Sequence, residues 1–169
     1  MNVARLASRP APVVPPVVPA LIWVAVLAFF FAQIEVQIEG GEGWATGLPT
    51  WRIESHWLLD IFWGGRAMTG YHAWAFPFIA LFFHFPLLFW GYWSLCAQCR
   101  VLAYIMLFWI LEDFLWFVIN PEFGIARFDA ASVPWHKHWL WFAPIEYWIY
   151  LPLAVFLLWQ STRNKSKQR

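Results

Sequence analysis

The stretch Trp109–Pro121, WILEDFLWFVINP, decides how this chain is interpreted. Its adjacent acids, Glu112 and Asp113, lie inside an apolar run that begins at Val101. The length and composition of that run predict a membrane-spanning helix. Carboxyl groups are costly inside a membrane, and ionisable residues there mark functional sites by default. The pair is therefore the first candidate for a functional site.

The composition of the chain is that of a membrane protein. Of its 169 residues, 62% are hydrophobic, 22% are aromatic and only 12% are charged, whereas soluble domains carry about 25% charged residues. Two cysteines, Cys96 and Cys99, are too few for a disulfide framework. The only basic cluster is a short C-terminal tail, so no nucleic acid is expected as a partner.

Four apolar runs predict an all-α, polytopic integral membrane protein built as a four-transmembrane-helix bundle. The expected spans cover residues 17–38, 71–95, 101–119 and 139–160. The segments 39–70 and 120–138 are expected to form an extracytoplasmic cap, in which residues 50–63 lie on the membrane as a short amphipathic helix. Residues 1–16 form a Pro-rich cytoplasmic arm, and residues 161–169 form a basic cytoplasmic tail.

Basic residues predict the orientation of the spans. If the N-terminus is cytoplasmic, that side holds Arg5, Arg9, Arg100, Arg163, Lys165, Lys167 and Arg169. The opposite side then holds only Arg52, Arg66, Arg127 and Lys137. The same topology places all ten acids on or toward the outer side. We therefore expect a bacterial inner (plasma) membrane protein with both termini in the cytoplasm.

The outer half of the expected bundle receives an ionisable side chain from every span. A rise of about 1.5 Å per residue places Glu112 roughly 12 Å, and Glu146 roughly 10 Å, below the outer ends of their spans. Carboxylates and imidazoles that converge from several helices suit a divalent metal ion, whose identity the sequence leaves open. The predicted metal ligands are Glu35, His72, Glu112 and Glu146, with His136 and His138 as further ligands or a lid.

The same region supplies candidates for catalysis and substrate contact. Glu112, Asp113 and Glu146 are the candidate catalytic groups. Only one of the adjacent acids Glu112 and Asp113 can point at the bundle axis, so the other should find a basic or hydroxyl partner. The candidate substrate contacts are Arg52, Arg66, Trp109, Trp116 and Trp148. The first hypothesis is a small membrane protein that binds or acts on a lipid, quinone or isoprenoid; whether it is an enzyme stays open.

Other interpretations of the acids remain open. Arg66 or Arg127 could neutralise them in an ion-pair network, or they could carry protons because burial disfavours the charged form. A proton path across the membrane is disfavoured because only His84 lies in the inner half. The second functional hypothesis is a non-catalytic accessory subunit of a larger membrane complex. In that case the partners are other membrane subunits, lipid or pigment.

The segment CAQCR, residues 96–100, contains a CxxC pair. A redox dithiol is one interpretation of such a pair. The expected topology places it on the cytoplasmic side, where thiols stay reduced. An ordinary short loop between the second and third spans is therefore favoured.

Overall fold

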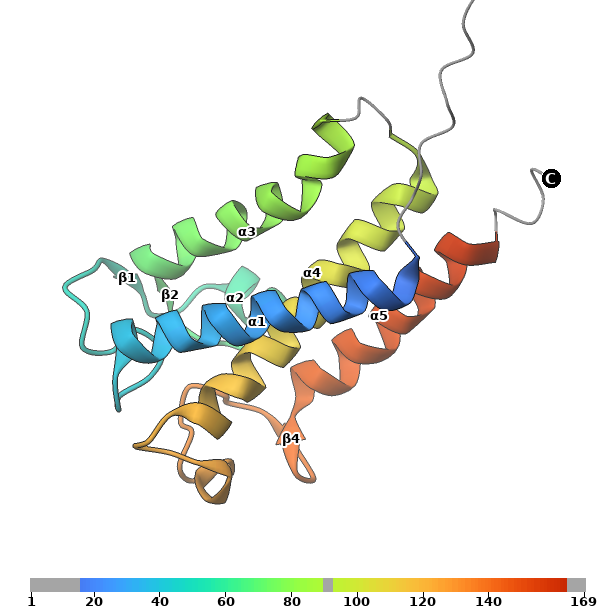
Figure 1. The fold of residues 1–169 in the computed structure, drawn as a ribbon. Coiled ribbons are helices and arrows are strands. Elements are labelled where there is room, and N and C mark those ends of the chain that lie inside the picture. The colour runs from blue at the N-terminus through green and yellow to red at the C-terminus, as the bar shows by residue number, and fades with distance from the viewer. Residues whose placement is uncertain (1–15, 90–92, 164–169) are drawn as a thin grey trace, which may run out of the picture.

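Four long helices dominate the computed structural model, which describes residues 16–89 and 93–163 (Figure 1). They are α1 (Val17–Glu39), α3 (Gly70–Phe89), α4 (Leu95–Ile119) and α5 (Ile145–Arg163). By length and composition, three of them, α1, α3 and α4, can cross a membrane. The prediction of a mostly helical chain with membrane-spanning helices is confirmed to that extent. A fourth span, which would be α5, stays a prediction.

The helix α4 begins earlier than expected. The side-chain oxygen of Ser94 accepts a hydrogen bond from the backbone N–H of Ala97 at 3.1 Å, which satisfies one of the free N–H groups in the first helical turn. The segment CAQCR is therefore the start of α4, and its interpretation as a loop is wrong. Cys96 and Cys99 are free thiols of intermediate burial.

Small elements join the long helices at one end of the bundle. The strands are β1 (Arg52–Ile53), β2 (Met68–Thr69), β3 (Trp139–Leu140) and β4 (Ala143–Pro144). β1 pairs antiparallel with β2, and β3 pairs antiparallel with β4. The hairpin of β3 and β4 delays the start of α5 to Ile145, later than the expected residue 139. The surface helix expected at 50–63 is reduced to α2 (Trp57–Phe62).

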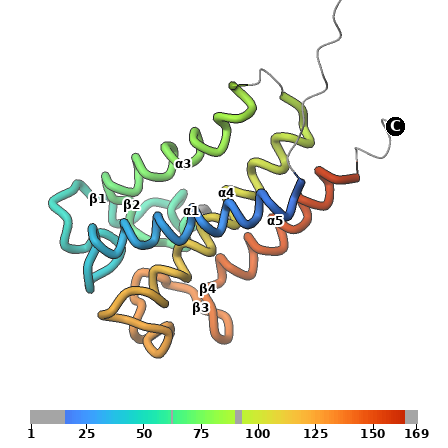
Figure 2. The backbone as a smooth tube through the Cα atoms, viewed as in Figure 1, coloured from blue at the N-terminus to red at the C-terminus, as the bar shows by residue number. Residues whose placement is uncertain are grey.

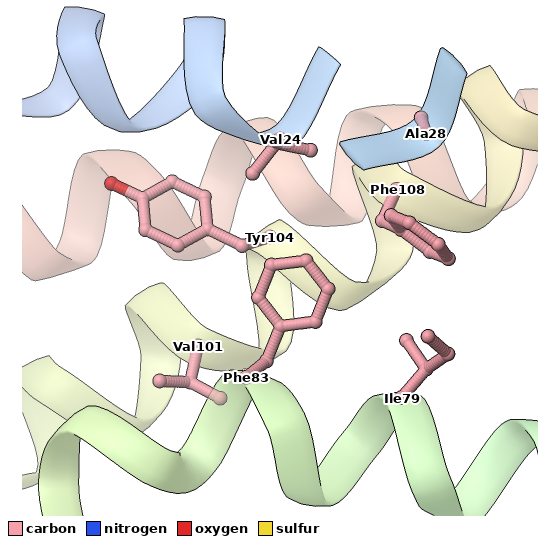
Figure 3. Packing of buried hydrophobic residues seen from close by; sticks show 7 residues of the cluster. All are labelled: Val24, Ala28, Ile79, Phe83, Val101, Tyr104 and Phe108. Atoms are coloured by element: carbon pink, nitrogen blue, oxygen red, sulfur yellow. The ribbon is translucent and has the colours of Figure 1, made fainter. Parts of the chain in front are cut away.

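The long helices pack around α4. Both α1 and α5 pack closely along α4, whereas α3 meets α4 over a shorter stretch. Figure 3 shows the side chains of the first core cluster gathered between α1, α3 and α4. They are Val24, Ala28, Ile79, Phe83, Val101, Tyr104 and Phe108. A second cluster lies nearer the loops and consists of Ala32, Val36, Trp116, Phe117 and Val133.

The connecting segments separate the bundle into two ends. The segments that follow α1 and α4 gather at one end, while the start of α1 and the end of α5 lie at the other (Figures 1 and 2). The segments 39–70 and 120–138, expected as a cap, lie at the first end, and their extracytoplasmic position stays a prediction. Most of the expected Pro-rich arm (1–15) and of the basic tail (164–169) lies outside the described residues.

Candidate functional site

A cavity of about 450 Å³ lies at the loop end of the bundle. Its polar lining consists of the carboxyl groups of Glu35, Glu39, Glu112, Asp113 and Glu146, with Arg66 and His72. Its aromatic lining consists of Trp44, Trp63, Phe76, Trp109, Trp116, Phe117, Trp135, Tyr147 and Tyr150. The four ionisable residues that we placed in the outer half of the spans therefore lie around one cavity. Their roles as ligands or catalytic groups stay predictions.

Asp113 and Glu146 belong to an ion-pair network with two basic partners, Arg66 and His136. The Arg66 guanidinium lies 3.1 Å from Glu146 Oε1 and 3.9 Å from Asp113 Oδ1. The buried His136 ring places Nε2 at 3.2 Å from Asp113 Oδ2 and Nδ1 at 3.8 Å from Glu146 Oε1. Tyr147 donates its hydroxyl hydrogen to Asp113 Oδ2. Asp113 thus has the basic and hydroxyl partners that the sequence predicted for one of the adjacent acids.

Arg66, rather than Arg127, is the arginine of this network. Arg127 donates to the backbone oxygen of Glu122 at 2.7 Å instead. Arg66 also lies over the ring of Trp44, with its Cζ 4.6 Å from the ring centroid. Because Arg66 already neutralises carboxylates of the protein, it is poorly placed to bind an anionic head group of a substrate.

Gly64 allows the segment before Arg66 to approach Glu146. Its φ is +56°, and a Cβ at this position would lie 2.1 Å from Glu146 Oε1. An L side chain there would be strained by the backbone conformation and would displace the Glu146 carboxylate. The structure thus supplies the reason for a glycine at this position.

Glu35 and Glu112 form a second group of acids. Their carboxyl groups are neighbours in the lining of the cavity. Tyr71 donates its hydroxyl hydrogen to Glu35 Oε1 at 2.8 Å. In the described part of the chain, no arginine, lysine or histidine lies within ion-pair distance of either carboxyl group. This pair therefore differs from the neutralised network of Asp113 and Glu146.

Glu39 was missed by sequence reasoning and is held by a left-handed turn. Gly43, Trp44 and Ala45 have φ values of 63°, 45° and 52°. This conformation directs the backbone N–H of Ala45 to Glu39 Oε1 at 2.6 Å. The same oxygen lies 3.7 Å from Nε2 of His72. Because the backbone already holds this carboxylate, we assign Glu39 a positioning role beside His72.

Trp44 connects this turn to the rest of the cavity wall. Its ring stacks on His72 with centroids 3.9 Å apart and an interplanar angle of 18°. Its Nε1 donates to the backbone oxygen of Ala67 at 2.7 Å. These contacts make Trp44 part of the site, although sequence reasoning did not name it as a site residue.

Three polar atoms of cavity-lining residues are buried without a hydrogen-bond partner among the described residues. They are Glu112 Oε1, Glu146 Oε2 and Trp116 Nε1. Buried polar groups are almost always paired, and an unpaired one costs about 1–3 kcal/mol. These atoms therefore mark the place where the polar group of a bound molecule would be stabilised.

The contacts of the site do not support the predicted metal centre. Within residues 16–89 and 93–163, no three or more His, Cys, Asp or Glu side chains are arranged to hold a metal ion. Nδ1 of His72 lies 2.7 Å from Thr69 Oγ1, and Asp113 and Glu146 contact Arg66 and His136. Divalent metal binding therefore stays a prediction.

Four predicted site residues are not part of the cavity lining, namely Arg52, His136, His138 and Trp148, although His136 contacts the lining residues Asp113 and Glu146. Arg52 donates to the backbone oxygen of Ala45, and Nε1 of Trp148 donates to the backbone oxygen of Leu140 at 3.1 Å. His138 is exposed, although His136 is buried. The two histidines were expected together as further ligands or a lid, but only His136, whose N–H donates to the backbone oxygen of Val133, is buried next to the site.

Helical spacing could have identified one of the missed aromatic residues. Tyr150 follows Glu146 by four residues in α5, so both side chains face the same side of the helix. Trp109 and Trp116 have the same kind of spacing relative to Asp113 and Glu112, and both were predicted. Trp63 lies in a loop, where no periodic pattern applies.

His84 belongs to a different part of the fold. Its Nδ1 lies 2.7 Å from the backbone oxygen of Ala80, and its Nε2 lies 2.8 Å from Nε2 of Gln98. This histidine therefore joins α3 to the beginning of α4 and does not line the cavity.

Known proteins offer no assignment for this site. No protein-family model, no curated protein and no solved structure matches the chain.

Proposed function

We propose that the protein is a small integral membrane protein that takes a hydrophobic molecule from the bilayer into this cavity. We further propose that Glu112, together with Glu35, exchanges a proton with that molecule. The observation that carries this proposal is the presence of unpaired buried polar atoms, on Glu112, Glu146 and Trp116, in a cavity whose other walls are largely apolar.

The walls of the cavity favour an entrance from the lipid. The lining includes Pro77 and Ala80 of α3, Ile105 and Met106 of α4, and Tyr150 of α5. α3 and α5 do not pack closely against each other in the described structure. A hydrophobic chain can therefore extend between these helices while its polar end reaches the carboxyl groups.

The membrane arrangement belongs to the same proposal. α5 has 19 residues, which corresponds to roughly 28 Å at about 1.5 Å per residue and is close to the ~30 Å hydrocarbon core. We therefore keep four spans in a bacterial inner membrane, with both termini in the cytoplasm. In this arrangement the cavity lies in the outer half of the bilayer.

The two groups of acids have different proposed roles. Asp113 and Glu146 contact Arg66 and His136, so they act as fixed charges that position a ligand. Glu35 and Glu112 have no cationic partner within the described residues, and a carboxyl group that holds or releases a proton beside a bound molecule is suited to general acid–base chemistry. Glu112 is the member with a free oxygen, so it is the residue assigned to contact the substrate.

A photolabelling experiment tests the proposal. The purified protein in lipid nanodiscs is labelled with a dodecan-1-ol that carries a mid-chain diazirine, and the labelled peptides are identified by mass spectrometry. We expect labelling of α3, α4 and α5 around the cavity that saturates and is displaced by unlabelled dodecan-1-ol. Trp116→Phe, which removes an unpaired donor, should change the half-saturating concentration, whereas Glu54→Gln, at an exposed acid, should not.

Other outcomes of this experiment would replace the proposal. Labelling that is uniform on lipid-facing residues and does not saturate would exclude a binding site. Stable co-purification with other membrane subunits, without saturable labelling, would favour the accessory-subunit hypothesis. Stoichiometric divalent metal that is lost in both Glu112→Ala and Glu146→Ala would favour the metal centre.

A further inference from the structure

We infer that the molecule bound in this cavity carries a protonated amine at its polar end. This inference rests on the proposed function, because it names the chemical class of the ligand for the same site. Three features of the cavity support it, namely its excess of carboxyl groups over basic side chains, its aromatic faces and the kind of polar atom that is left unpaired.

The acids of the site outnumber its cations. Five carboxyl groups line the cavity, and Arg66 is the only arginine or lysine among its lining residues in the described part of the chain. Arg66 contacts Glu146 and Asp113, so no arginine or lysine of the described residues pairs with Glu35, Glu39 or Glu112. A cationic ligand would supply the positive charge that these buried carboxyl groups lack.

Aromatic rings make the same preference stronger. The lining includes the indoles of Trp44, Trp63, Trp109, Trp116 and Trp135. A cation over an indole face is attracted by the ring quadrupole, and this attraction grows when the site is desolvated. The contact of Arg66 with the Trp44 ring shows that a cation already occupies one aromatic face of this cavity.

The unpaired carboxyl oxygens select for a hydrogen-bond donor. Glu112 Oε1 and Glu146 Oε2 both lack a partner among the described residues. An ammonium group brings three N–H donors and a positive charge, whereas a hydroxyl brings one donor and no charge. A quinone brings only acceptors, and a carboxylate or phosphate would add an anion to a site that is already lined by five carboxyl groups. Of these groups, the ammonium is the best match.

Competition between molecules of equal chain length tests the inference. Dodecylamine, dodecan-1-ol and dodecanoate each compete with the diazirine alcohol in nanodiscs of zwitterionic lipid, with concentrations expressed per bilayer volume. We expect dodecylamine to displace the label at a roughly tenfold lower concentration than dodecan-1-ol, as a desolvated cation–aromatic contact allows. Dodecanoate should be the weakest competitor.

Charge-neutral variants test whether the carboxyl groups of Glu112 and Glu146 cause the preference for an amine. Glu112→Gln and Glu146→Gln each replace an acid by an amide of the same shape, and the advantage of dodecylamine should fall to about threefold or less as a charge-assisted hydrogen bond is lost. The exposed control Glu54→Gln should retain the full advantage. Size-exclusion chromatography and circular dichroism show whether each variant is folded. If one variant misfolds, the other still tests the inference.

The outcomes separate this inference from the proposed function. If dodecan-1-ol competes as well as dodecylamine in the wild type, or if the amine advantage persists in both glutamine variants, the amine inference is wrong although a hydrophobic site exists. If none of the three molecules displaces the label, the proposed function fails as well.

Discussion

Replacement of Gly64 by alanine should disrupt the ion-pair network from outside the cavity. Two costs follow from the structure. The first is backbone strain, because φ is +56°, and an L residue in this region costs roughly 1–2 kcal/mol. The second is steric, because the new Cβ would lie 2.1 Å from Glu146 Oε1. That oxygen must move, and with it the contact to Arg66.

The second cost is the larger one. The side chains of Arg66 and Glu146 are only 12% and 8% exposed, and breaking a buried pair costs about 3–5 kcal/mol. We therefore expect Gly64→Ala to lower the free energy of unfolding by roughly 4–7 kcal/mol. The measurement is unfolding of the purified protein in mixed micelles with increasing sodium dodecyl sulfate, followed by circular dichroism.

The chain offers a matched control at Gly124. Its φ is +67°, but a Cβ there would have no atom within 4 Å, so Gly124→Ala should cost only the roughly 1–2 kcal/mol of backbone strain. In addition, Glu146→Ala removes the group that clashes, so Gly64→Ala should cost much less in that background. Equal destabilisation by Gly64→Ala and Gly124→Ala would refute the argument, as would additive effects of Gly64→Ala and Glu146→Ala.

Three further predictions follow from the contacts described above. Arg66→Met should lower the free energy of unfolding by about 3–5 kcal/mol because it leaves two buried carboxylates without their arginine; Arg52→Met is the control, and a similar loss there would contradict the role of the network. Ser94→Ala should cost about 1 kcal/mol because it removes the cap of α4; no loss of stability or helix content would show that the cap is dispensable. Cys96 and Cys99 should react with a membrane-impermeant maleimide in inside-out vesicles but not in intact spheroplasts; reaction in spheroplasts would invert the proposed topology.

The sequence predicted the depth of the ionisable residues along their helices, but it predicted only in part the direction in which each side chain points around its helix. Residue number converts directly into distance along a helix axis, and this simple relation placed Glu35, His72, Glu112 and Glu146 at one level. Glu112 and Asp113 differ by about 100° around α4, so the sequence could predict that they point differently. It did not reveal that Glu112 faces Glu35 while Asp113 faces Arg66 and His136.

The loop residues of the site depend on contacts between remote segments. Arg66 and Glu146 are 80 positions apart in the chain, and no local pattern connects them. The left-handed turn that holds Glu39 and the turn that buries His136 but exposes His138 have no periodic signature either. Glu39 and Trp44 were therefore missed as site residues, and His138 was predicted as one although it lies away from the cavity.

The sequence by itself determined the class of the protein and the depth of its acids along the helices. Both follow from position along the chain, because the length of an apolar run and the rise per residue of a helix need no knowledge of tertiary contacts. Only the tertiary structure decided which acids are neutralised and which are left with unpaired oxygens, because that depends on how α1, α4, α5 and two loops meet in space. The two acids of WILEDFLWFVINP show this division, since they are adjacent in sequence and yet belong to different networks.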